Sequence, residues 1–177
     1  MIVRTAVLAT AAVLMLFGLR GAGIAGGPSF TETEWPFLLD QWGRGRAFHC
    51  GPADCGVEVH LYLRAKIGFC NCAAGVADDT ELDRVGDVSL LSDHFVGLRD
   101  SAVVTVGWMS GRSKVYDVQP AYGAHIPALA IAFNDKCDVI VATVVAGKQI
   151  TAETEQAALA FLNSEAVLRW AKTELGV

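Results

Sequence analysis

Residues 57–67, VEVHLYLRAKI, alternate between apolar and polar side chains along their whole length. Alternation with a period of two is typical of a strand that has one buried face and one wet face. Because Leu, Arg, Ala and Lys also favour helices, a helix over 54–68 is the alternative. The expected buried set is Val57, Val59, Leu61, Leu63, Ala65 and Ile67, and the expected wet set is Glu58, His60, Tyr62, Arg64 and Lys66.

Two further segments predict pairs of strands. Residues 101–118 predict two strands joined around Ser110-Gly111, a pair of residue types common in tight turns. Residues 126–147 predict a hairpin with its turn at NDKCD. Its strands are almost continuously apolar, so we expect them in the middle of the sheet with both faces covered.

Helices are expected in three places. Residues 29–42 predict an N-terminal helix with Pro36 in its first turn, and residues 76–87 predict a short central helix capped by Asp78 or Asp79. Residues 151–176 predict a long amphipathic helix that Ser164 divides in two. The sequence therefore predicts an α+β fold of about five mainly antiparallel strands, covered by the C-terminal helix, with shorter N-terminal and central helices.

The N-terminus has the features of a secretory signal. One basic residue, Arg4, precedes an apolar run from Thr5 to Leu19, and small residues follow in GLRGAGIAGG. The run is shorter than the roughly 20 residues that a membrane-spanning helix needs. We therefore expect residues 1–25 to be cleaved as a signal peptide, which leaves no stable membrane anchor and a single globular domain over residues 26–177.

Composition limits the classes of partner. Removing residues 1–25 leaves 12 of the 14 basic residues against 19 acidic ones, so the mature chain carries a formal charge of −7. This balance argues against nucleic acid, whose phosphates require clustered Lys and Arg. The chain has no G-x-S-x-G nucleophile elbow and no phosphate-binding glycine loop after a strand, so a catalytic function is not favoured.

Five cysteines dominate the candidate chemistry. Exported chains meet an oxidising compartment, where cysteines form disulfides, and an odd count leaves one thiol over. Cys50 and Cys55 enclose a turn-forming GPAD loop and are expected to pair. Cys70 or Cys72 is expected to bond to Cys137, and the other is expected to stay free. A strand over 57–67 would separate the first two cysteines from Cys70 and Cys72, so a four-cysteine zinc site is not expected.

Three functions remain open from the sequence. The favoured one is a secreted or periplasmic, disulfide-stapled, non-catalytic protein that binds an unknown ligand or protein partner and needs no cofactor. The first alternative is a soft-metal protein or chaperone in which Cys70 and Cys72 hold copper or zinc, with His49 or His60 as a further ligand. The second alternative is a thiol–disulfide redox enzyme, although the C-x-x-C motif of such enzymes is absent.

Overall fold

The computed structural model describes residues 28–147 and 149–177, so the expected signal peptide lies outside the described part of the chain. Eight strands form one antiparallel sheet. They are β1 (Thr31–Thr33), β2 (Arg46–Cys50), β3 (Val59–Lys66), β4 (Phe95–Gly97), β5 (Ala102–Val106), β6 (Met109–Val118), β7 (Ile126–Asp135) and β8 (Asp138–Ala146). The helices are α1 (Pro52–Cys55), α2 (Asp79–Val85), the 3-10 helix η1 (Val88–Leu90), α3 (Ala152–Leu162) and α4 (Glu165–Leu175).

The strands follow the order β1-β2-β3-β8-β7-β6-β4, and β5 also pairs with β6. The β7–β8 hairpin occupies the centre, and its turn lies at Lys136-Cys137, as the sequence predicts. Residues 128–133 of β7 and 139–144 of β8 are buried without interruption. Strands covered on both faces need no polar side, which explains their continuous apolar sequence.

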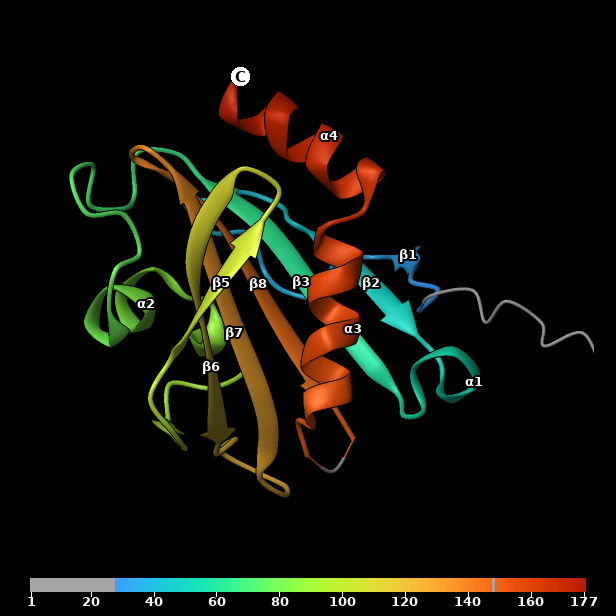
Figure 1. Ribbon diagram of the computed structural model, residues 1–177. Coiled ribbons are helices and arrows are strands. Elements are labelled where there is room, and N and C mark those ends of the chain that lie inside the picture. The colour runs from blue at the N-terminus through green and yellow to red at the C-terminus, as the bar shows by residue number, and fades with distance from the viewer. Residues whose placement is uncertain (1–27, 148) are drawn as a thin grey trace, which may run out of the picture.

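Each face of the sheet carries its own core. Helices α3 and α4 cover one face, here called the α3–α4 face, where Leu61, Ile131 and Leu162 pack in the larger core. Helix α2, η1 and the segment around Cys70 cover parts of the other, here called the α2 face, where Leu82, Ala130 and Val141 pack. Figure 1 shows the sheet with α3 lying across it and α2 beside β6 and β7.

The α+β class is correct, but the prediction of about five strands is wrong. The three strands that the sequence did not reveal are β1, β2 and β4, which have three to five residues each. The expected N-terminal helix over 29–42 is also wrong, because Thr31–Thr33 pairs with β2 as an edge strand. Pro36 disfavours helical geometry at Trp35, which precedes it, and so favours an extended chain here.

The predicted turn at Ser110-Gly111 lies three residues too late. The β5–β6 hairpin turns at Gly107-Trp108, with Val106 opposite Met109. Gly107 has φ of +59°, as the first central position of a two-residue hairpin turn requires. Gly111 lies inside β6 instead, where a Cβ atom would collide with the Ala132 carbonyl of β7.

The predicted central and C-terminal helices are confirmed. The Asp78 carboxylate accepts a hydrogen bond from the Glu81 amide and caps α2. Thr151 caps α3 in the same way, and Ser164 caps α4 after the predicted break. In the part of the chain that the structure describes, none of the helices has the length and apolar character needed to cross a membrane.

The predicted strand is confirmed over Val59–Lys66, but Val57 and Ile67, which were expected to be buried, lie outside it and are exposed. Part of its expected wet face is buried instead. The side chains of Arg64 and Lys66 are each only 4 % exposed. Arg64 donates two hydrogen bonds to Asp87, and Lys66 Nζ lies 2.6 Å from an oxygen of the same carboxylate. Burial lowers the pKa of Lys66, and the charge of Asp87 opposes this shift. One buried carboxylate thus pairs with two cations that the alternation places toward solvent.

Residues 34–43 lie over this ion cluster. Asp40 accepts hydrogen bonds from Arg64 at 2.7 and 2.9 Å, and the Trp42 ring lies 4.4 Å from the Phe69 ring. Trp35 and Phe37 pack edge-on against Tyr62. The segment therefore closes the α2 face along the second half of β3.

We expect Asp87→Asn to lower the free energy of unfolding by about 3–5 kcal/mol, because it removes the carboxylate that pairs with buried Lys66 and leaves buried Arg64 with the partly exposed Asp40 carboxylate alone. Glu32→Gln is the control, since Glu32 forms a surface ion pair with Arg46. That substitution should cost less than about 1 kcal/mol. Urea unfolding followed by circular dichroism measures both values, and equal small losses would contradict the importance of the buried cluster.

Candidate functional site

The first half of β3 presents a cluster of histidine and carboxylate side chains on the α2 face. His49 of β2 and His60 of β3 are cross-strand partners with ring centroids 5.2 Å apart. Phe48 and Cys50, on either side of His49, belong to the α3–α4 core, so His49 lies on the opposite face. Glu58 precedes His60 by two residues and shares its face.

Glu58 lies between the two imidazoles. Its Oε1 atom is 2.5 Å from His49 Nε2 and 4.0 Å from His60 Nε2. One donor atom from each of the three side chains lies within 4.8 Å of the other two. The side chains are between 34 % and 50 % exposed, so they are held at the surface and remain accessible to a ligand.

A cavity of about 270 Å³ adjoins this cluster. Glu58 and His60 form one of its walls, and His125 lines it from the loop that leads into β7. His125 Nδ1 lies 2.6 Å from an Asp117 carboxylate oxygen, which fixes the orientation of the ring. The remaining lining residues are Ile126, Pro127, Val145, Ala146 and Gly147. We call this cavity, together with His49, the open end of the α2 face.

The Cys50–Cys55 disulfide holds the connection between the two histidine strands. Cys50 ends β2 directly after His49, and Cys55 ends α1 three residues before Glu58. Figure 1 shows α1 in the connection between β2 and β3, and the bridge joins the last residue of β2 to the last residue of α1. It therefore restricts the backbone that carries all three side chains of the cluster.

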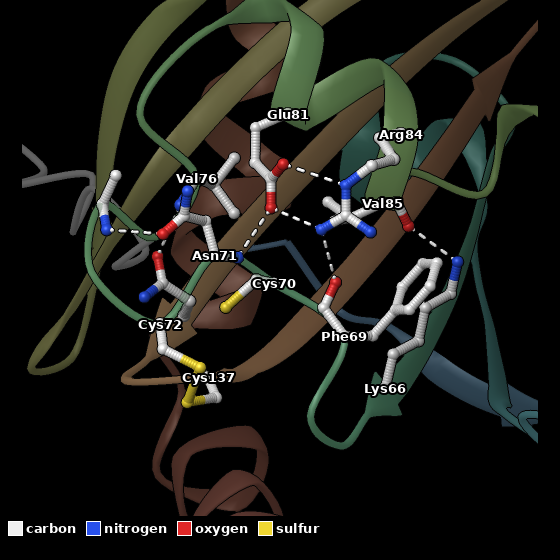
Figure 2. Close-up of polar contacts among 12 residues, drawn as sticks. Lys66, Phe69, Cys70, Asn71, Cys72, Val76, Glu81, Arg84, Val85 and Cys137 are labelled. Carbon is white, nitrogen blue, oxygen red and sulfur yellow. Dashed lines mark hydrogen bonds and ion pairs between the residues drawn. A yellow bond between two sulfur atoms is a disulfide. The ribbon is translucent and has the colours of Figure 1, made fainter.

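The second group of cysteines lies at the other end of β3. Cys72 is bonded to Cys137 in the β7–β8 turn, and Cys70 is a free buried cysteine. Figure 2 shows the Cys72–Cys137 bridge. It also shows the backbone amide of Asn71 donating a hydrogen bond to the Glu81 carboxylate of α2. Arg84 bonds both to Glu81 and to the Phe69 carbonyl, so this segment is fixed against α2.

These positions do not form the soft-metal site that the first alternative placed at Cys70 and Cys72. The Cys72 sulfur is part of a disulfide and offers no thiolate. Cys70 Sγ lies 3.1 Å from the Lys136 carbonyl, which accepts its hydrogen bond. His49 and His60 lie with the first half of β3, away from the Lys66 end that leads to Cys70. The structure brings the two histidines together with Glu58 instead.

Comparisons with known proteins identify no relative. No protein-family model, no curated protein and no solved structure matches the chain. The structure contains two disulfides, and disulfides are typical of proteins exported to an oxidising compartment.

We expect the two disulfides to contribute unequally to stability. Cys72 and Cys137 are 65 residues apart, whereas Cys50 and Cys55 are five apart. Loop-closure entropy predicts a contribution of about 4 kcal/mol for the long loop and about 2 kcal/mol for the short one. Urea unfolding of Cys72→Ala/Cys137→Ala and of Cys50→Ala/Cys55→Ala measures the difference, and the reverse order would contradict the entropic explanation.

We expect Cys70 to be chemically inert in the folded protein. Burial, followed by the negative charges of Glu81 and Asp138, raises the pKa of its thiol to about 11. Because the thiolate is the reactive form, iodoacetamide at mildly alkaline pH should label the native protein very slowly. Unfolded, unreduced protein should take up one label per chain. Mass spectrometry counts the labels, and fast native labelling would revive the thiol–disulfide enzyme hypothesis.

Proposed function

We propose that the protein is an exported, non-catalytic binding protein that works in the periplasm or outside the cell and binds a small ligand at the open end. The observation that carries this proposal is the cavity itself. It combines an apolar floor with three polar side chains directed from two sides, a combination typical of ligand sites.

The surroundings of the cavity suit a preformed site. Its walls come from β3, β7 and β8, which are neighbours in the sheet, so ligand binding needs little ordering of the backbone. The Asp117 carboxylate orients His125, and the Cys50–Cys55 bridge restrains the start of β3. Rigid walls with a few oriented polar groups favour a specific small molecule over a broad protein partner.

The size and chemistry of the cavity limit the ligand. A volume of about 270 Å³ is slightly below the usual range for ligand pockets, so the ligand must be small. Val145 and Ile126 can contact an alkyl or aryl group, while the imidazoles of His60 and His125 can hydrogen-bond to a carboxylate. We therefore propose a small organic acid with an apolar body as the ligand class.

Export is supported by two independent features. The N-terminal sequence has the basic, apolar and small-residue parts of a secretory signal. Two disulfides join four of the five cysteines, which suits an oxidising compartment. The acidic balance of the chain supports a ligand or protein partner rather than nucleic acid.

NMR titration of metal-free protein tests the ligand site. The probes are butyrate, hexanoate and benzoate, and the expected result is a set of amide shift changes confined to the residues that line the cavity. Val145→Phe should abolish these changes, because the larger ring fills the cavity from β8. Val103→Phe is the matched control, since Val103 is an exposed residue of β5 outside the cavity lining.

Two outcomes would overturn the proposed ligand site. One is the absence of localised shift changes with all three probes. The other is equal binding by wild type and Val145→Phe, provided that circular dichroism shows the variant to be folded. Either result would rule out the organic-acid site in this cavity.

A further inference from the structure

We propose that His49, Glu58 and His60 form a binding site for a divalent transition-metal ion, with Cu²⁺ bound most tightly and Zn²⁺ second. The inference deepens the proposed function, because it uses the same open end and rests on this surface being a binding site. It differs in its ligand, which is a metal ion held by side chains beside the cavity.

The donor atoms are close to the spacing that a metal ion needs. Metal bonds of about 2.1 Å in a tetrahedral shell place neighbouring donors about 3.4 Å apart. The His60–Glu58 separation of 4.0 Å must shorten slightly, and the His49–Glu58 separation of 2.5 Å must lengthen slightly. Small rotations of three partly exposed side chains achieve both changes without moving the strands.

The backbone holds the donors on one surface. His49 and His60 face each other across the β2–β3 ladder, so their spacing is set by strand pairing. Glu58 is on the same face because it is two residues from His60. The Cys50–Cys55 bridge joins the end of β2 to the end of α1 and so restrains the connection that leads to β3, which lowers the entropy lost when a metal orders the side chains.

The chemistry of the donor set selects the metal class. Two imidazoles and one carboxylate suit copper and zinc, whereas calcium and magnesium prefer shells made of oxygen alone. Divalent copper binds such nitrogen-containing sites more tightly than zinc does. Cys50 cannot add a thiolate, because its sulfur is bonded to Cys55 and its side chain packs in the α3–α4 core.

Three protein ligands leave a coordination position for water or another molecule. Glu58 and His60 also line the cavity, so this position is directed toward it. His125, oriented by Asp117, stands on the same cavity and supplies a nearby nitrogen. An ion at this site would therefore face a small space in which a carboxylate could complete its coordination.

Isothermal titration calorimetry of chelator-stripped protein with Cu²⁺ or Zn²⁺ alone tests the proposal. The expected result is one ion per chain near neutral pH. His49→Ala, His60→Ala and Glu58→Gln should each weaken binding at least tenfold. His94→Ala is the matched control, because His94 lies just before β4 at the other edge of the sheet, and its affinity should equal that of wild type.

Electron paramagnetic resonance of the Cu²⁺ complex gives a second readout that misfolding cannot imitate. The spectrum should show coupling to two imidazole nitrogens in wild type and to one fewer in the folded His49→Ala protein. No binding by wild type, or equal loss of affinity in His94→Ala, would overturn the metal site. Unchanged affinity in all three ligand variants would also overturn it.

The two proposals fail separately. If metal-free protein binds the carboxylate probes in the cavity but wild type binds neither ion, the ligand site stands and the metal site falls. If one ion binds through the two histidines but no carboxylate binds the metal-free protein, the metal site stands and the separate organic-acid site falls.

Discussion

The pairing of Asp87 with Arg64 and Lys66 is the interaction on which the arrangement of the α2 face depends. β3 carries polar side chains on that face, and a sheet face can be covered only if its charges are neutralised. Asp87 lies between α2 and η1, so its ion pairs hold both against β3. Asp40 then accepts hydrogen bonds from Arg64 Nη1 and brings residues 34–43 over the same region. These ion pairs thus hold α2, η1 and residues 34–43 over the second half of β3, where the side chains on the α2 face are charged.

The same interaction determines which part of the α2 face stays uncovered and available for the proposed binding site. Along β3 the polar row changes from paired and buried at Arg64 and Lys66, through Tyr62 under two aromatic rings, to accessible at His60 and Glu58. Segments from other parts of the chain cover Lys66, Arg64 and Tyr62, but they do not extend over His60 and Glu58. The open end is therefore a consequence of how far the covering segments reach, and its histidine and carboxylate groups are the ones that no buried counter-charge has fixed.

Long regular segments were predictable from the sequence, whereas short strands and charge burial were not. The β7–β8 hairpin, α2 and the two C-terminal helices each have an uninterrupted pattern or a capping residue that specifies them locally. β1, β2 and β4 have at most five residues, too few for a period to show. The alternation in 57–67 placed Glu58 and His60 on one face correctly, but it could not show that Asp87, more than twenty residues away, makes Arg64 and Lys66 part of the interior. His49 joins the cluster only through the pairing of β2 with β3, which no local pattern reveals.

Four cysteines have the disulfide role that the sequence favoured, and this leaves the alternative metal site at Cys70 and Cys72 without one of its sulfurs. A pair of cysteines two residues apart suggests a metal clasp when the chain is considered locally. A distant partner, Cys137, occupies one of the two sulfurs, and burial holds the other in its protonated form. The Cys50–Cys55 bridge contributes in a different way, by restraining the strands that carry His49, Glu58 and His60. In this fold the disulfides restrain the backbone, and the partly exposed imidazole and carboxylate groups are the ones that a ligand could reach. In the oxidising compartment that we propose, the bridges would form and would leave imidazole and carboxylate groups as the ligands available for a metal ion.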